Sequence, residues 1–192
     1  MKNSRIFTLI VLFTASLFTF NANVQQPDAL LDKIVQANQN LKNRNGSFSE
    51  VRQMVGKAEQ KLDGELVYEA PSVLTMNYSD PNEYFSINAN TMSLKREGKA
   101  RKFDLTKNKP MKTLSQLLLS SFNGNLRELA TTVGSSLNVE ETKDAVIATL
   151  QAQKKAVKGY SKVILKYDSK TYHLLNMVME EFDGSVTTYT WE

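Results

Sequence analysis

The sequence predicts an α+β protein that is mainly β: an open, strongly curved antiparallel sheet, or half-barrel, of about ten strands, with about three helices covering its concave face. Apolar and polar residues alternate along many short segments, which is typical of strands with one buried face. Short loops with turn-forming residues separate these segments and favour antiparallel pairing. Helical spacing occurs in only two regions, so helices can cover one face of the sheet but not both, and a sheet this long tends to curl.

The chain begins with a segment typical of a secretory signal. Two basic residues precede an apolar run over residues 6–20, which is too short to span a bilayer comfortably. We therefore expect a signal peptide over residues 1–22, cut after Ala22, and a single domain over residues 23–192. Because Phe20 is bulkier than the small residue usually found near a cleavage site, an uncleaved anchor is the alternative.

Local signals indicate the first helix and the strands that follow it. Pro27 and Asp28 favour a helix start, and apolar residues at helical spacing extend this helix over residues 28–42. Asn45 and Gly46 have turn chemistry and should end it. Alternating residues then predict strands over residues 47–55, 62–69, 73–78, 84–88 and 92–96.

The period changes in the middle of the chain. Apolar residues three or four positions apart predict a broken pair of helices over residues 112–133. Asn123 and Gly124 mark the break, because Gly releases one helix and Asn can cap the next. Asp183 and Gly184 supply a hairpin turn between the last two strands. The predicted strands of this half are residues 136–140, 145–152, 160–167, 172–182 and 186–191.

Composition limits the possible partners. With 192 residues, 41% of them hydrophobic, the chain can build one domain with a sizeable core. It has no cysteine, so it forms no disulfide and its mature N-terminus cannot be lipidated. The formal charge of +4 loses two units with Lys2 and Arg5, and the remainder is too small to argue for nucleic acid. We interpret the basic cluster at residues 95–102 as a solvated hairpin with its loop, and docking to an acidic partner is the alternative.

The sequence lacks the residue combinations that common catalytic sites require. His173 is the only histidine, so Cys/His metal sites and histidine-dependent triads cannot be assembled. The Gly-x-Ser-x-Gly elbow and the glycine-rich phosphate loop are absent. The adjacent carboxylates at 140–141 and 180–181 point to opposite faces of a strand and suit a surface better than an acid/base pair. We therefore expect no enzyme activity, no metal and no cofactor.

The large apolar residues of the sequence indicate instead an interior that could bind an apolar ligand. Alternation places many large apolar residues on one sheet face, and the central helices can face them. Methionine and aromatic side chains are adaptable linings for an acyl chain, although the same residues would also make an ordinary dry core. The candidate acyl-chain cavity consists of Phe48, Leu66, Tyr68, Leu74, Met76, Tyr78, Phe85, Ile87, Met92, Leu94, Leu117, Leu118, Phe122 and Leu126.

Several segments resemble a known family. Residues 64–81, GELVYEAPSVLTMNYSDP, are similar to the Gly-x-Leu, Arg-Pro-x-x-aromatic and aromatic-x-x-Pro pattern of the LolA type, the periplasmic carrier of outer-membrane lipoproteins. Residues 48–53, FSEVRQ, resemble its Phe-x-Gln strand, with the Gln displaced by two positions. Asn90 and Thr91 stand where the family commonly has an Asp-Gly turn, and the leucine-rich segment 114–122 resembles the helix after its central strands.

The resemblance implies a fold and a function. The fold would be an open antiparallel half-barrel closed on its concave side by helices. The protein would be a periplasmic monomer that takes acylated lipoproteins from an inner-membrane lipoprotein-releasing ABC transporter. It would shield their acyl chains and deliver them to an outer-membrane receptor. Relatives with this half-barrel also bind glycolipids or sense envelope stress, so a lipid-binding or envelope-sensing module is the alternative.

Two departures from the family pattern affect its closed state and its docking. In the family an arginine before the proline ties the helical lid shut, whereas here Ala70 precedes Pro71. Arg52, in a neighbouring predicted strand, is the candidate substitute for this lock. The family usually continues beyond Trp191 with a further strand and loop that help to dock the transporter.

Overall fold

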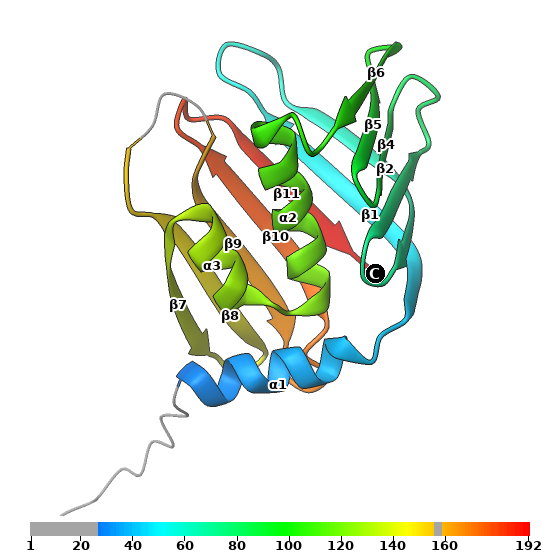
Figure 1. The fold of residues 1–192 in the computed structure, drawn as a ribbon. Coiled ribbons are helices and arrows are strands. Elements are labelled where there is room, and N and C mark those ends of the chain that lie inside the picture. The colour runs from blue at the N-terminus through cyan, green and yellow to red at the C-terminus, as the bar shows by residue number, and fades with distance from the viewer. Residues whose placement is uncertain (1–26, 156–158) are drawn as a thin grey trace, which may run out of the picture.

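The computed structural model describes residues 27–155 and 159–192, which share one curved antiparallel sheet and three helices (Figure 1). The signal peptide expected over residues 1–22 lies outside these ranges. The helices are α1 (Pro27–Gln39), α2 (Lys109–Asn123) and α3 (Leu126–Val133). The strands are β1 (Asn43–Gln53), β2 (Gln60–Glu69), β3 (Val73–Tyr78), β4 (Tyr84–Asn88), β5 (Thr91–Arg96), β6 (Lys99–Asp104), β7 (Ser135–Glu141), β8 (Ala145–Ala152), β9 (Tyr160–Asp168), β10 (Leu174–Glu181) and β11 (Val186–Trp191).

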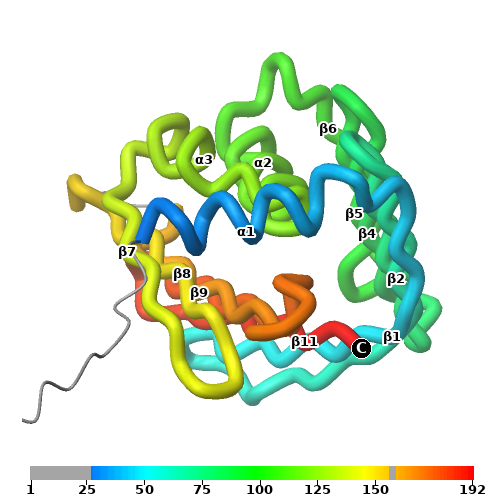
Figure 2. The backbone as a smooth tube through the Cα atoms, turned by 90° about the horizontal axis from the view of Figure 1, so that it is seen from below, coloured from blue at the N-terminus to red at the C-terminus, as the bar shows by residue number. Residues whose placement is uncertain are grey.

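The sheet is open, with β6 and β7 as its edges. Its strands follow the order β6-β5-β4-β3-β2-β1-β11-β10-β9-β8-β7, and β1 pairs with β11 at the centre, where Phe48 lies opposite Trp191. Figure 2 shows the three helices on the inner side of the curve. The prediction of an open antiparallel half-barrel with helices on its concave face is confirmed, with eleven strands rather than about ten. No helix within residues 27–155 and 159–192 is long and apolar enough to cross a bilayer.

The predicted break between α2 and α3 is confirmed. The side chain of Asn108 accepts a hydrogen bond from the Met111 amide at 3.1 Å, and Pro110 fits the first turn, so α2 begins with a regular cap. Gly124 ends α2 in the left-handed conformation, with φ of 81°. A Cβ on Gly124 would lie 3.0 Å from the carbonyl oxygen of Ile34, so this position also lets α2 approach α1 closely.

The predicted turn at Asn45 and Gly46 is wrong. The first helix ends at Gln39, and both residues lie inside β1, where Gly46 pairs with Leu66. A Cβ at Gly46 would meet the carbonyl oxygen of Glu192 at 2.1 Å. The glycine is therefore required by the close approach of two backbones, and not by a turn.

Strand β6 was not among the predicted strands. Its burial pattern is almost uniformly exposed, so it lacks the alternation that marks a half-buried strand. Glu97 and Gly98 both have positive φ, 51° and 78°, and form the tight turn that joins β5 to β6. The basic cluster thus lies on a hairpin, as expected, and its lysines suit an edge strand because they discourage further pairing.

The core fills the space between the sheet and the helices. One face of each helix packs onto it: Leu30 and Ile34 from α1, Leu118 and Phe122 from α2, and Leu129 from α3. From the sheet it takes the inward residues of the strands, among them Leu66, Tyr68, Leu74, Met76, Ile87, Met92, Leu165, Tyr167, Met177 and Trp191. The same core therefore spans both halves of the sheet.

Candidate functional site

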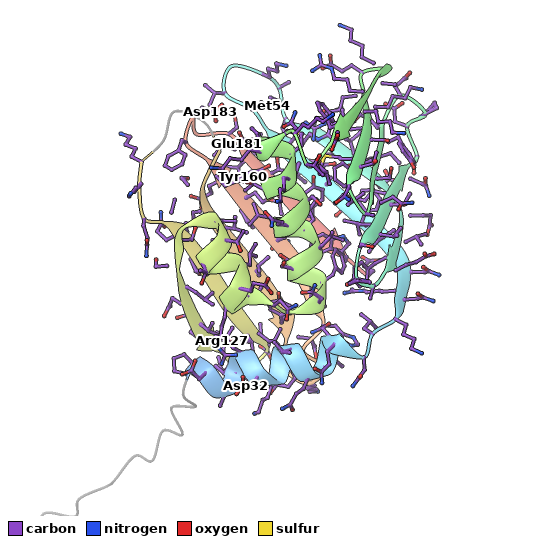
Figure 3. The ribbon with its side chains drawn as sticks, in the orientation of Figure 1. Asp32, Met54, Arg127, Tyr160, Glu181 and Asp183 are labelled. Atoms are coloured by element: carbon purple, nitrogen blue, oxygen red, sulfur yellow. The ribbon has the colours of Figure 1, made fainter. Side chains whose placement is uncertain are left out.

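A cavity of about 780 Å³ opens where the helices leave the sheet uncovered. It lies between the first half of α2, the end of α3 and the adjoining ends of β7 to β10. Figure 3 shows Tyr160 and Glu181 at this end of the molecule, beside the start of α2. Its lining residues are Lys109, Pro110, Met111, Thr113, Leu117, Val133, Gly134, Ser135, Leu150, Ala152, Gln153, Lys154, Gly159, Tyr160, Ser161, Lys162, Val163, Glu181 and Phe182.

The cavity has an apolar floor and a charged rim. Leu117, Leu150 and Val163 form the floor and also belong to the buried core, with exposed fractions of 1–3%. Lys109 and Lys154 are exposed at the rim. A concave apolar surface with a few polar groups at its edge is the usual form of a small-molecule or lipid site.

The titratable groups at the rim are partly removed from water. Burial raises the pKa of Glu181 above its ordinary value of 4.5, and the neighbouring Asp183 raises it further, while Arg96 opposes the shift. Burial also raises the pKa of the Tyr160 hydroxyl, with a contribution from Glu181. Lys162 pairs with Glu180 at 3.0 Å. The mouth of the cavity thus has a lower polarity than open solvent although charged residues surround it.

The fourteen residues proposed for an acyl-chain cavity occupy three settings. Leu117 lines the cavity and also lies in the core. Tyr78 and Leu94 are half-buried and pack against the core. The others lie in the core between the helices and the sheet, where their side chains fill the space: Phe48, Leu66, Tyr68, Leu74, Met76, Phe85, Ile87, Met92, Leu118, Phe122 and Leu126. Their contact with an acyl chain stays a prediction.

The sequence reasoning missed the wall that β8 and β9 give to the cavity. Leu150 and Val163 lie opposite each other in the pairing of these strands. The signal was present, because β8 and β9 both alternate apolar with polar residues. The candidate list drew its strand residues from the first half of the chain alone, and the pairing that brings β8 and β9 under α2 is not visible in the alternation.

Hydrogen bonds fasten the helices over the sheet. The buried hydroxyl of Tyr167 on β9 donates to the carbonyl of Ser121 on α2 at 2.9 Å. The Asn38 amide of α1 donates to the carbonyl of Tyr172, before β10, at 2.8 Å. On the outer side Arg127 of α3 pairs with Asp32 of α1 at 2.8 Å (Figure 3). The bonds of Tyr167 and Asn38 oppose movement of α2 and α1 away from the concave face, whereas the Arg127–Asp32 pair joins α3 to α1.

Arg52 does not tie the helices in this structure, in contrast to the substitute lock considered above. Its guanidinium donates to Glu50 at 2.9 Å and to Glu83 at 3.0 Å, and both acceptors lie on the strand side of the core. The Tyr78 hydroxyl also donates to Glu50. Although burial alone would lower the pKa of Arg52, its bonds to Glu50 outweigh that effect and raise it. We call Glu50, Arg52, Tyr78 and Glu83 the buried ion cluster.

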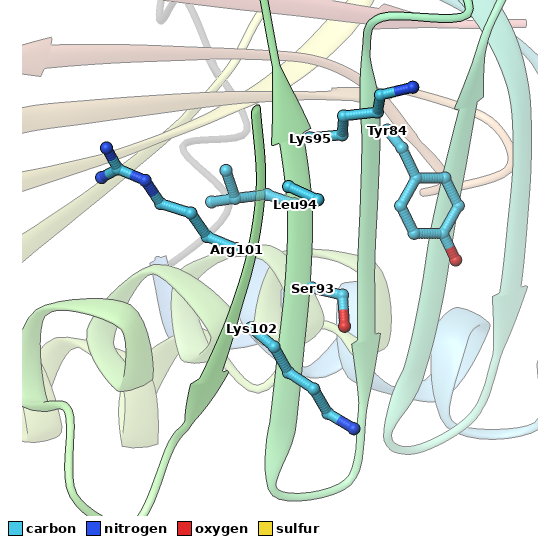
Figure 4. A pocket seen from close by; sticks show the side chains of 7 residues that line it. Tyr84, Ser93, Leu94, Lys95, Arg101 and Lys102 are labelled. Carbon is cyan, nitrogen blue, oxygen red and sulfur yellow. The ribbon is translucent and has the colours of Figure 1, made fainter. Parts of the chain in front are cut away.

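A second hollow, of about 360 Å³, lies on the β4–β5–β6 edge of the sheet (Figure 4). Its lining includes Tyr84, Leu94, Lys95, Arg101 and Lys102. The basic side chains there are the residues of the exposed hairpin, and Tyr84 is 37% exposed. This hollow is smaller than the cavity at α2, and the two share no lining residue.

Comparisons with known proteins give similarity in fold alone. No family model matches the sequence, and no curated protein matches it. Similar solved structures include a LolA superfamily protein from Nitrosomonas europaea, at 10% identity over 86% of this chain and 91% of that chain, with a TM-score of 0.40. A putative outer membrane lipoprotein-sorting protein domain from Vibrio parahaemolyticus has 9% identity over 85% of this chain and 88% of that chain, with a TM-score of 0.43.

A third similar structure is the MucA/MucB complex of Pseudomonas aeruginosa, at 13% identity over 84% of this chain and 54% of that chain, with a TM-score of 0.38. At these identities and scores the likeness carries no conclusion about ligand or partner. The likeness concerns only the general arrangement, an open antiparallel sheet with three helices on its concave face.

Proposed function

We propose that this protein is a periplasmic carrier that binds the acyl chains of lipoproteins in its interior and moves them from the inner to the outer membrane. An inner-membrane lipoprotein-releasing ABC transporter would supply the cargo, and an outer-membrane receptor would accept it. The observation that supports this function best is the cavity of about 780 Å³ at α2, whose floor is part of the core. An acyl chain that enters there would meet an apolar floor that continues into the core, and it would go deeper only where core side chains give way.

The size and the energetics suit a carrier. Ligand pockets usually enclose about 300–1,000 Å³, and a longer chain would need the helices to move outward. Each buried CH₂ group contributes about 0.8 kcal/mol, whereas a typical hydrogen bond contributes about 0.5–1.5 kcal/mol. About four CH₂ groups therefore offset the bonds of Tyr167 and Asn38 that hold α2 and α1 down. The bound acyl chain covers the apolar surface that this movement of the helices exposes. Such a balance permits both uptake and release.

The second candidate is a module that binds free lipid or glycolipid, or senses envelope stress. The feature that favours it is the pair of exposed rim lysines, Lys109 and Lys154, because a cationic rim suits an anionic headgroup. Identification of the bound species separates the two functions. We expect native mass spectrometry of the protein from a periplasm to show co-purified acylated polypeptides, whereas free lipid alone would support the second candidate.

A cavity-filling variant tests the site. Thr113 lines the cavity, whereas its neighbour Lys112 is exposed on the same helix and does not. We expect Thr113→Trp to weaken binding of dansyl-labelled undecanoic acid about tenfold or more, because the indole occupies the ligand's space. The change is measured by fluorescence titration. Lys112→Trp is the matched control and should bind as the wild type does. Equal binding by both variants, with circular dichroism showing intact folds, would contradict the proposal.

A further inference from the structure

One aromatic ring of α2 lies among hydrogen-bond donors of the sheet. Tyr68 of β2 stacks on Phe122 with ring centroids 5.1 Å apart, and Trp191 of β11 meets the same ring edge-on, also at 5.1 Å. The guanidinium carbon of Arg44, at the start of β1, lies 5.7 Å from the Phe122 centroid. Three strands that pair at the centre of the sheet thus each place beside the Phe122 ring a side chain that carries a hydrogen-bond donor.

Two of these donors have no partner. Within residues 27–155 and 159–192, the Tyr68 hydroxyl and the Trp191 indole nitrogen are the buried side-chain polar atoms without a hydrogen bond. Tyr68 is 0% exposed and Trp191 is 2% exposed, so neither side chain faces bulk solvent. Buried polar groups are nearly always paired, and leaving one unpaired is costly. Two unpaired donors on rings that pack against the same phenylalanine therefore call for an explanation beyond ordinary packing.

The third donor is only partly used. One guanidinium nitrogen of Arg44 donates to the carbonyl of Leu174 at 2.8 Å. Burial lowers the pKa of Arg44, but a guanidinium remains charged and has five N–H groups. The position next to Phe122 is therefore donor-rich and carries positive charge. In the closed state, an apolar ring occupies it.

We infer that Tyr68, Trp191 and Arg44 form a binding site for the carbonyl oxygen of an acyl group, and that Phe122 occupies this site when no ligand is bound. This inference rests on the proposed function and specifies its ligand chemistry. A carbonyl oxygen donates no hydrogen bond and has two lone pairs, so it can accept from two of these three donors. When α2 moves outward, Phe122 leaves with it, and the acyl ester of a ligand can take its place. The hydrocarbon chain then follows the apolar residues of the core.

Phe122 is suited to this exchange. It belongs to α2, whose first half lines the cavity, so widening the cavity and withdrawing Phe122 are movements of one helix. The Tyr167 hydroxyl that holds α2 binds Ser121, the residue directly before Phe122. The donors lie on β1, β2 and β11, in the centre of the sheet, and remain fixed while the helix moves. The site would thus distinguish an acylated molecule from a plain hydrocarbon.

The test uses two glycerol lipids with the same chain and headgroup. 1-Monooleoylglycerol has an ester carbonyl, and 1-O-oleylglycerol has an ether in its place. We expect the full mature protein to bind the ester about three- to tenfold more tightly than the ether, as one or two hydrogen bonds would give. Tyr68→Phe should weaken binding of the ester by about threefold or more and leave binding of the ether unchanged. Dissociation constants from displacement of dansyl-labelled undecanoic acid provide the measurement.

Stability separates this role from a structural one. Because the Tyr68 hydroxyl has no partner in the closed state, Tyr68→Phe should keep or raise the midpoint of thermal unfolding. Tyr84→Phe, which changes an exposed tyrosine on β4, is the control and should alter neither lipid affinity nor stability. The affinity for oleate, compared with that for 1-monooleoylglycerol, shows whether the site prefers a carboxylate or an ester. Preference for oleate over the ester would assign the site to fatty acids.

Three outcomes would overturn the inference. Equal affinities for ester and ether, unchanged by Tyr68→Phe, would remove the carbonyl site and leave acyl-chain binding intact. A lower unfolding midpoint of Tyr68→Phe without a change in ester preference would indicate a buried water as the missing partner. Binding of neither lipid, together with an absence of co-purified acylated species, would reject the proposed function as well.

Discussion

The concave face holds two sets of buried polar groups that differ in how their hydrogen bonds are satisfied. In the buried ion cluster, Arg52 donates to both Glu50 and Glu83, and Tyr78 donates to Glu50. Beneath α2, the polar atoms of Tyr68 and Trp191 have no partner in the described residues. The three charged residues of the first set are as well removed from water as Tyr68 and Trp191, so the difference lies in their chemistry and not in their exposure. A satisfied set stabilises the closed fold, whereas an unsatisfied set has binding capacity left for a ligand.

The buried ion cluster joins distant parts of one half of the sheet. Arg52 lies on β1, and Glu83 lies just before β4, three strands away in the sheet order. Glu83 also accepts a hydrogen bond from the Glu97 amide at 3.0 Å, which anchors the turn between β5 and β6. Two carboxylates share one guanidinium, so the tyrosine and backbone donors complete their hydrogen bonding. Removal of the guanidinium would leave two buried carboxylates facing each other.

The largest expected effect follows from that arrangement. Arg52→Met keeps much of the side-chain volume but removes the charge, so it should lower the free energy of unfolding by about 3–5 kcal/mol. Urea titration monitored by the fluorescence of Trp191, the only tryptophan, measures the change. Arg101→Met, on exposed β6, is the matched control and should cost less than about 0.5 kcal/mol. If Arg52→Met lowered the free energy of unfolding as little as Arg101→Met is expected to, the ion cluster would be dispensable for stability.

Much of the fold could be predicted from the sequence because strands and helices with one buried face repeat apolar residues at a regular period. Ten of the strands and the break at Asn123 and Gly124 follow from alternation and capping, whereas exposed β6 leaves no such signal. Gly46 misled the prediction because its requirement comes from Glu192, at the other end of the chain. A residue constrained by a distant backbone cannot be distinguished locally from a turn residue.

The candidate site was less accessible to sequence reasoning. The cavity depends on the distance between α2 and the strands β8 and β9, and no local pattern encodes that distance. The buried ion cluster did leave a trace: Phe48, Glu50 and Arg52 occupy alternate positions of one strand and so share its inward face. Two charged residues on an apolar face predict a buried pair. Such a pattern would have argued against Arg52 as a free lid residue.

A pair of tyrosines gives a direct comparison of satisfied and unsatisfied hydroxyls. The Tyr167 hydroxyl donates to the Ser121 carbonyl, which lies in the last turn of α2, where carbonyls lack helical partners. Tyr167→Phe leaves this buried carbonyl unpaired and should lower the free energy of unfolding by about 1–3 kcal/mol. Tyr68→Phe removes a hydroxyl without a partner and should not destabilise the protein. Chemical denaturation of both variants measures the difference.

Hydrogen exchange locates the effect of Tyr167→Phe. The amides near the end of α2 should exchange faster, while those of β3 and β4 stay as in the wild type, because the lost bond fastens the helix alone. Equal destabilisation by Tyr167→Phe and Tyr68→Phe would contradict the distinction between the two sets of polar groups.

The smallest expected effect concerns a carboxyl of intermediate burial at the cavity mouth. Burial and the nearby Asp183 raise the pKa of Glu181 above 4.5 in the folded state. A carboxyl with a raised folded pKa binds its proton more tightly in the folded protein than in the unfolded chain. Its contribution to stability is therefore complete below the unfolded pKa and is lost as pH rises through the folded pKa.

Glu181→Gln should therefore flatten the decline in stability as pH rises from about 4 into the neutral range, since a glutamine does not ionise. At neutral pH the variant should be at least as stable as the wild type, because an amide enters a poorly hydrated site at lower cost than a carboxylate. Urea titrations at several pH values measure both curves.

Glu180→Gln, at the position before Glu181 in β10, is the control. This variant loses the half-exposed pair with Lys162 and should be slightly less stable than the wild type at neutral pH. Parallel curves for Glu181→Gln and the wild type would mean that water reaches this carboxyl freely, and that the mouth of the cavity is more polar than its lining indicates.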